Sequence, residues 1–175
     1  MLPLVLTFIL LAIALSIVFW SIRNGITPMP STPKAKKNIL ELLPQNLNGN
    51  ILELGSGWGT LAFSIAKKLP QCQVTAYENS PVPFLFSKLR LFIQPRKNLS
   101  IQFQNFFHAD LSHAQCIVCY LYPGAMQKLN TKFKKELKPG TWILSNTFAL
   151  TGRSPIQSKT INDLYNTKIY LYQIK

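Results

Sequence analysis

The chain carries a short apolar run that leads into closely spaced glycines, Asn50-Ile51-Leu52-Glu53-Leu54-Gly55-Ser56-Gly57-Trp58-Gly59-Thr60. Residues 50–54 are mostly apolar, which predicts a buried strand. Residues 60–69 carry apolar side chains at helical spacing, which predicts a helix that begins directly after the glycines. A strand, a tight turn and a helix in this order are typical of the first unit of a parallel α/β sheet.

The same alternation of strands and helices continues on both sides of this unit. We expect further strands at residues 73–77, 100–103, 115–121, 141–148 and 168–174, and further helices at residues 37–43, 83–92 and 125–137. The last strand alternates apolar and polar side chains, and we expect it to run antiparallel to its neighbours. The pattern therefore predicts an α/β fold with an open, mostly parallel sheet and an antiparallel last strand.

The first residues form a separate apolar segment. Residues 1–20 contain no charged side chain and only Pro3, Thr7 and Ser16 outside the apolar set. About 20 apolar residues in a helix span the roughly 30 Å hydrocarbon core of a bilayer. A signal peptide, the alternative, has basic residues before its apolar run, whereas here Arg23 and the lysines follow it. We therefore expect residues 1–22 to be a transmembrane anchor in the lipid bilayer.

The distribution of charge predicts the topology of the anchored chain. Because the basic residues follow the apolar run, the N-terminus should lie outside and the following domain on the cytoplasmic side. The membrane would be a bacterial inner membrane, or the mitochondrial inner membrane with the domain on the matrix side in a eukaryote. Residues 23–37 combine prolines with lysines, which predicts an extended basic linker along the headgroups, and residues 38–175 predict one domain.

The net charge of +13, from 19 Lys and Arg against 6 Asp and Glu, favours contact with an anionic surface. Lipid headgroups and nucleic acid both meet this description. No recognised nucleic-acid-binding module is visible, so a nucleic-acid partner is not expected. Cys116 and Cys119 form a lone C-x-x-C pair inside a predicted buried strand, and a metal site is not expected there.

The glycine turn is a candidate cofactor site. Gly55, Ser56, Gly57 and Gly59 follow the first strand, at the edge of an open α/β sheet where ligands bind. A plain tight turn would show the same glycines. A dinucleotide fingerprint, G-x-G-x-x-G, is not met because the third glycine comes one residue early. Glu53 would repel a pyrophosphate but suits an ammonium group, and these electrostatics favour S-adenosylmethionine.

Two further acids follow later strands of the predicted sheet. Glu78 closes the second strand beside Asn79, where a carboxylate can accept hydrogen bonds from ribose hydroxyls. Asp110 follows the third strand, where we expect it to contact the adenine amino group with Leu111 or Phe107 as apolar cover. We therefore expect Glu53, Glu78 and Asp110 to converge on one pocket.

These residues resemble the class I, seven-strand, Rossmann-like methyltransferases that use S-adenosylmethionine. The glycine loop and Glu78 are shared across that superfamily. Other motifs are similar to its small membrane-anchored branch, which includes the lysine methyltransferase of ATP-synthase subunit c: Tyr120-Leu121-Tyr122-Pro123-Gly124-Ala125-Met126, Glu136-Leu137-Lys138-Pro139-Gly140 and Ser145-Asn146-Thr147-Phe148. The resemblance implies methyl transfer to a lysine nitrogen of a membrane or membrane-adjacent protein. The chain departs from that branch at Trp58, where an acid is common.

The resemblance also places the acceptor after the fourth strand. Tyr120, Tyr122 and Pro123 follow that strand, and we expect the two tyrosines to act in catalysis as walls that align the acceptor amine. Burial of one tyrosine as strand packing is the alternative, because neighbours along a strand point to opposite faces. Other acceptors remain open, namely RNA or a small lipid-soluble molecule, as does a catalytically inactive, membrane-tethered binding module.

Overall fold

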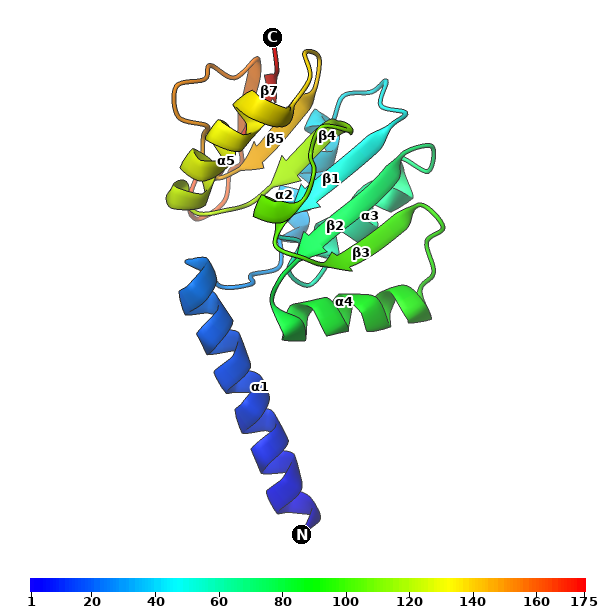
Figure 1. Ribbon diagram of the computed structural model, residues 1–175, viewed down its shortest axis with the longest axis vertical. Helices are drawn as coiled ribbons and strands as arrows, with labels where there is room; N and C mark the ends of the chain where they lie inside the picture. The colour runs from blue at the N-terminus through cyan, green and yellow to red at the C-terminus, as the bar shows by residue number, and fades with distance from the viewer.

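The computed structural model describes residues 1–175 as one α/β domain from which a long N-terminal helix projects (Figure 1). The helices are α1 Leu2–Asn24, α2 Pro33–Leu42, α3 Thr60–Lys68, α4 Pro81–Ile93 and α5 Pro123–Glu136, with a short 3₁₀ turn, η1, at Phe106–His108. The strands are β1 Asn50–Leu54, β2 Gln73–Glu78, β3 Leu99–Phe103, β4 Ala114–Cys119, β5 Trp142–Asn146, β6 Gln157–Thr160 and β7 Lys168–Gln173.

The strands form one seven-stranded sheet in the order β3-β2-β1-β4-β5-β7-β6. Neighbouring pairs among β1 to β5 are parallel, and β7 lies antiparallel between β5 and β6. The predicted mostly parallel sheet with an antiparallel last strand is therefore confirmed. Strand β6 was not predicted, because its sequence, QSKT, is polar throughout and three of its four side chains are exposed at the sheet edge.

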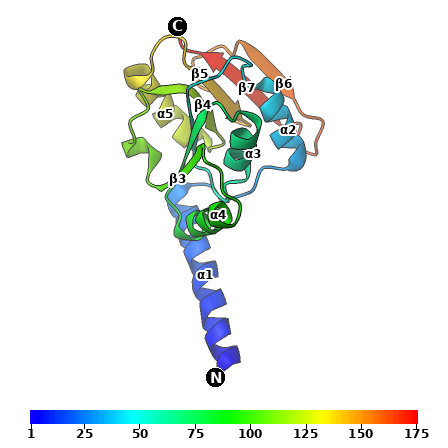
Figure 2. The same ribbon diagram turned by 90° about the vertical axis from the view of Figure 1, so that its right-hand side faces the viewer.

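Helices cover both faces of the sheet (Figure 2). Apolar side chains of α2 and α3 form one core with one face of the central strands, and part of α4 packs against it. Helix α5 builds the second core on the opposite face, through Met126, Leu129 and Phe133. Apolar burial on both faces explains why the inner strands read as nearly continuous apolar runs.

Helix α1 contacts the domain only near its C-terminal end. It has 23 residues, none of them buried, and its N-terminal turns project away from the domain (Figures 1 and 2). The helix is long and apolar enough to cross a membrane, and a signal sequence near an N-terminus has the same properties. The predicted apolar helix is confirmed as a helix.

The connection between α1 and the domain differs from the predicted extended linker. Helix α2 begins at Pro33 rather than at residue 37, because Thr32 caps it by accepting a hydrogen bond from Ala35 N at 3.1 Å. Proline is tolerated in the first turn of a helix, so Pro33 starts α2 rather than preventing it. The irregular stretch is thus shorter than expected.

The ends of the central strands meet at one edge, as the register requires. Leu54 of β1 pairs with Tyr77 of β2, and the backbone carbonyl of Tyr77 accepts hydrogen bonds from Gly55 N at 3.0 Å and Ser56 N at 2.9 Å. Strand β4 ends at Cys119, two residues earlier than expected, so Tyr120 and Leu121 lie in the loop beyond the sheet. This edge of the sheet carries the candidate site.

Candidate functional site

A cavity of about 260 Å³ lies at the carboxyl edge of the sheet, between the ends of β1, β2 and β4. Its lining comes mainly from five parts of the chain: the glycine loop, the end of β2, the loop after β3, the loop after β4, and the segment that leaves α1. The predicted residues that it brings together are Glu53, Gly55, Ser56, Gly57, Glu78, Asn79, Tyr120 and Tyr122.

The backbone of the glycine loop requires glycine at two positions that border the cavity. Gly55 has a φ of 76°, and a Cβ on it would lie 2.9 Å from Leu121 Cδ2. Gly57 has a φ of 53°, which also favours glycine. At Gly55 and Gly57 the loop therefore presents backbone, and no side chain, to the cavity.

Glu78 ties the loop to the end of β2. Its carboxylate accepts hydrogen bonds from Gly57 N and from Ser80 N, each at 2.7 Å. The side chain is buried, and each carboxylate oxygen can accept more than one hydrogen bond. Glu78 therefore orders the glycine loop and keeps acceptor capacity at the cavity wall.

Glu53 is a buried carboxyl group without a full set of partners. It is 5% exposed, and its Oε2 atom accepts no hydrogen bond. Burial raises the pKa of Glu53 to about 8, and the nearby Glu78 adds to this, while the backbone N–H of Ala62 acts in the opposite direction. The hydroxyl of Ser56, on the same cavity wall, is also buried and unpartnered.

The segment that leaves α1 forms one wall of the cavity. We call residues 23–31 the exit segment, and Asn24, Thr27, Pro28 and Met29 are among its lining residues. Asn24 and Asn79 exchange side-chain hydrogen bonds of 2.9 and 3.0 Å, and Asn24 also donates to Ser80 Oγ at 3.0 Å. The exit segment is thus fastened to the end of β2.

A second fastening joins the exit segment to the glycine loop. The indole Nε1 of Trp58 donates a hydrogen bond to the backbone carbonyl of Pro28. The same indole meets the ring of Phe86 from α4 edge-on, with 5.3 Å between centroids. Trp58 therefore lies between α4 and the exit segment.

The two tyrosines after β4 both line the cavity. Neither is fully buried, so the structure does not support the alternative in which one of them is buried as strand packing. The reason is that β4 ends before Tyr120, and alternation along a strand no longer applies. The ring of Tyr122 packs on Gly25, where a Cβ would lie 2.9 Å from Tyr122 Cζ.

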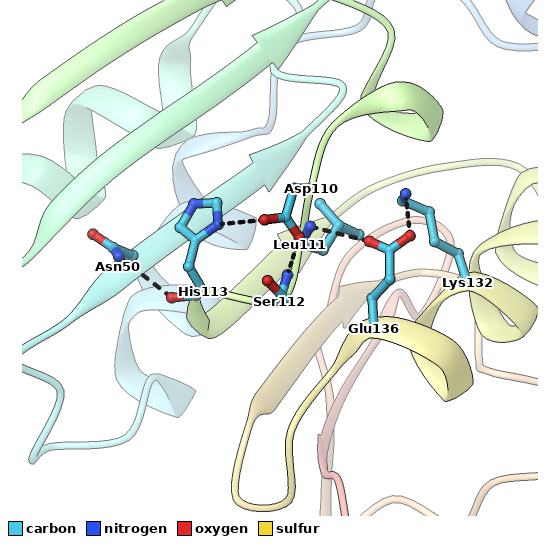
Figure 3. Close-up of polar contacts among 7 residues, drawn as sticks. All are labelled: Asn50, Asp110, Leu111, Ser112, His113, Lys132 and Glu136. Atoms are coloured by element: carbon cyan, nitrogen blue, oxygen red, sulfur yellow. Dashed lines mark hydrogen bonds and ion pairs between the residues drawn. The ribbon is translucent and has the colours of Figure 1, made fainter.

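Asp110 and Leu111 do not reach the cavity, which corrects the prediction that three acids converge there. The Asp110 side chain is 69% exposed and lies 3.8 Å from His113 Nδ1 (Figure 3). Leu111 is fully buried, and its backbone N–H donates to Glu136 Oε2 at 3.1 Å. The two residues belong to the surface and core beside α5.

The length of the β3 to β4 connection explains this error. The connection has already crossed to the amino edge of the sheet by Asp110, since His113 O accepts a hydrogen bond from Asn50, the first residue of β1 (Figure 3). Residues directly after β3 take the expected place instead, namely Asn105, Phe106 and Phe107. Counting from the end of the strand, rather than looking for the next acid, would have found Asn105.

The predicted cofactor contact of Gly59 and the predicted acceptor contact of Pro123 are also corrected, because neither residue lines the cavity. Gly59 is the N-cap of α3 with a φ of 70°, and a Cβ on it would lie 3.0 Å from Ser87 Cβ. It therefore allows α4 to approach α3. Pro123 opens the first turn of α5.

The sequence analysis did not predict the exit segment or Trp58 as parts of the site. An indole N–H in a glycine loop nevertheless signals the need for a nearby acceptor.

The lining fits the cofactor that the sequence implies. S-adenosylmethionine carries an ammonium and a sulfonium, and Glu53 Oε2 and Ser56 Oγ are buried acceptors that lack partners. Gly55 and Gly57 add no side chain to the cavity wall, and Glu78 has acceptor capacity for hydroxyl groups. The main observation is that the buried Glu53 Oε2 atom has no hydrogen-bond partner. Leaving such an atom unpaired costs free energy unless a bound ligand donates to it.

Comparisons with known proteins identify a methyltransferase family. Residues 53–157 match the family described as the ANTKMT methyltransferase domain. A protein-lysine N-methyltransferase of Saccharolobus islandicus is 27% identical over 152 residues, which cover 83% of this chain and 92% of that protein. A release factor glutamine methyltransferase of Koribacter versatilis is 25% identical over 67% of this chain, and the chain spans 52% of that protein.

The fold is shared with solved methyltransferase structures. An RNA methyltransferase of Salinibacter ruber, in complex with S-adenosylhomocysteine, superposes with a TM-score of 0.72 at 22% identity. The match covers 83% of this chain and 94% of that one. At 22% identity this similarity shows only a shared fold. Membership of the methyltransferase family rests on the match over residues 53–157.

Proposed function

Because the chain belongs to the family of ANTKMT methyltransferase domains, we propose that it is a membrane-anchored protein-lysine N-methyltransferase. It is a class I methyltransferase, and its methyl donor is S-adenosylmethionine. The proposed acceptor is the side-chain nitrogen of a lysine in a membrane protein or in a protein held at the membrane. The named activity of the Saccharolobus islandicus relative supports a lysine acceptor.

One observation carries the membrane part of the proposal. The exit segment of α1 lines the same cavity as Glu53 and Glu78, and Tyr122 packs on Gly25 within it. If α1 spans a bilayer, the cavity lies next to the membrane surface because the helix ends at the cavity wall. A lysine near the headgroups would then be within reach, whereas a site on the far side of the domain would not serve such an acceptor.

The donor end of the reaction is assigned to the glycine loop and its acids. We assign Glu53 and Ser56 to the ammonium of the donor, and Glu78 to its ribose hydroxyls. When bound, S-adenosylmethionine supplies a methyl group on a positively charged sulfur, which leaves as a neutral thioether when an amine attacks in line. Holding donor and acceptor in line lowers the barrier by several kcal/mol, and about 7–11 in favourable cases.

The acceptor end is assigned to the two tyrosines. A lysine must be neutral to attack, and an apolar, aromatic surrounding disfavours its charged form. Tyr120 and Tyr122 would form this surrounding and orient the amine through their rings or phenolic oxygens. The proton released on methylation can leave to solvent, since both tyrosines are partly exposed. The chain therefore does not require a dedicated catalytic base.

A labelling experiment tests this function. Membranes containing the full chain are incubated with S-adenosylmethionine that carries a radiolabelled methyl group, beside membranes that contain the Glu78→Ala variant. We expect the wild-type chain, but not the variant, to produce label. Protease should remove this label and ribonuclease should leave it. Label that ribonuclease removes would replace the protein acceptor by RNA, and label that resists both would point to a lipid-soluble acceptor.

A further inference from the structure

Helix α4 carries an apolar stripe that the chain leaves largely exposed. The buried face of the helix packs on the sheet through Pro83 and Ser87. The opposite face carries large exposed side chains: Leu85, Phe86, Leu89, Phe92 and Ile93. Their spacing of three, four and seven residues places them on one side of the helix. Phe92 is 83% exposed and Ile93 66%, so the stripe is open along the C-terminal half of α4.

Charge around the stripe has a single sign. Lys88 flanks it on the helix, and Arg96 and Lys97 follow in the next loop. Arg90, on the other flank, stacks its guanidinium on Phe63 of the domain, 4.2 Å from the ring centroid. No Asp or Glu occurs between Glu78 and Asp110. A helix with large apolar side chains on one face and basic residues at its flanks is typical of helices that lie in a lipid interface, where long basic side chains reach the headgroups.

The position of α4 relative to α1 also fits a helix that lies in a lipid interface. The two helices are in contact, and α4 lies crosswise to α1 beside its C-terminal turns (Figures 1 and 2). If α1 spans a bilayer, its C-terminal turns lie at the interface, and α4 then lies in the plane of that interface. Arg23 stacks on Trp20 at this level of α1, with 5.3 Å from the guanidinium to the ring centroid, and Trp is typical of this depth.

We propose that α4 is a second membrane contact, which lies in the anionic headgroup region with Leu89, Phe92 and Ile93 inserted among the upper acyl chains. This inference rests on the proposed function, because it takes α1 as a membrane span. The contact fixes the rotation of the domain about α1, which a single spanning helix cannot do. Through Trp58, which touches both Phe86 and the exit segment, the contact also borders the cofactor cavity.

A fluorescent reporter in the full-length chain tests this contact. The three native cysteines are buried, so a cysteine placed at Phe92 can be labelled selectively with an environment-sensitive dye. The labelled chain is reconstituted into vesicles of phosphatidylcholine and phosphatidylglycerol, with nitroxide quenchers either near the headgroups or deep in the acyl chains. Matched reporters replace Leu10 in the middle of α1 and Lys135 at the C-terminal end of α5.

The expected result is a blue shift and strong quenching at position 92 by the shallow nitroxide. Position 10 should respond to the deep nitroxide, and position 135 to neither. Quenching at position 10 without any at position 92 would overturn the α4 contact and leave the anchor standing. A blue shift at position 92 without quenching would also overturn it, because protein rather than lipid would then cover the stripe. Absence of quenching at position 10 would overturn the anchor and the α4 contact together.

Discussion

Asn24, the last residue of α1, and Asn79, the first residue after β2, are paired through two side-chain hydrogen bonds of 2.9 and 3.0 Å. The pair joins the apolar helix to the wall of the cofactor cavity. Any movement of the helix end is therefore transmitted to residues next to Glu78. A membrane anchor joined by a free linker would have no such effect.

Asn24→Ala should weaken binding of S-adenosylhomocysteine because the exit segment loses its fastening to the cavity wall. A hydrogen bond of this kind contributes about 1 kcal/mol, so a loss of roughly five-fold in affinity is expected. Calorimetry on the full chain in detergent measures it. Asn38→Ala is the matched control, since the Asn38 amide bonds only to Lys34 O on the surface. Equal affinities for the two variants would contradict the role of the pair.

Glu78→Gln should reduce affinity for S-adenosylhomocysteine more strongly, by about 10-fold or more, because charge-assisted hydrogen bonds are about twice as strong as neutral ones. The substitution replaces one carboxylate oxygen by an NH₂ group, which cannot accept from Gly57 N or Ser80 N. Glu41→Gln is the control, because Glu41 is exposed and pairs only with Lys159. Unchanged binding by Glu78→Gln would remove Glu78 from the cofactor site.

Glu53 should make the free energy of unfolding fall as pH rises. Burial raises its pKa to about 8 from 4.5, so the unfolded chain loses this proton at a lower pH than the folded chain. The contribution to stability is full below pH 4.5 and is lost as the pH rises towards 8. Denaturation of the full chain at several pH values in this range measures the free energy of unfolding. This free energy should fall less steeply with pH for Glu53→Gln than for the wild type or for Glu41→Gln. An identical pH dependence would contradict the raised pKa.

The same carboxyl group should release a proton when the cofactor binds at neutral pH. An ammonium beside Glu53 favours the carboxylate and so lowers its pKa. Calorimetry in buffers with different ionisation enthalpies measures the proton release, which Glu53→Gln should abolish. Proton release that survives in this variant would assign it to another group.

Gly25→Ala should slow methyl transfer because it displaces the ring of Tyr122. A Cβ at Gly25 would lie 2.9 Å from Tyr122 Cζ, so the ring must move. Gly152→Ala is a matched control, because Gly152 has a similar φ of 73° and nothing lies within 4 Å of its added Cβ. Both variants carry the backbone cost of a left-handed alanine, about 1–2 kcal/mol, but only Gly25→Ala should lower kcat. Equal kcat values for both would separate Tyr122 from the acceptor site.

Much of the fold was predictable because its signals are local. The apolar runs of β1, β2 and β4, the helical spacing of α3 and α5, and the glycine loop between them each follow from neighbouring residues. Strand β6 was not predictable in this way, since its polar residues are held only by pairing with β7. The start of α2 at Pro33 depends on a cap that a proline-rich stretch conceals.

The site was predictable where residues lie at the end of a strand or shortly after it. Glu53, Glu78, Tyr120 and Tyr122 lie where strand order places them. Asp110 was misplaced because the β3 to β4 connection returns to the amino edge without a long helix, and no local pattern reveals the path of an irregular segment. The exit segment was missed for a related reason, since its contacts with Trp58 and Asn79 join residues that are distant in sequence.

Mass spectrometry of membrane proteins from cells with the wild-type chain, and from cells with the Glu78→Ala variant, tests the proposed function most directly. The expected result is a methylated lysine, in a membrane protein near the headgroup level, that is present with the wild type and absent with the variant. A methyl group that depends on Glu78 but resides on a glutamine, on RNA or on a lipid would contradict the assignment of the acceptor.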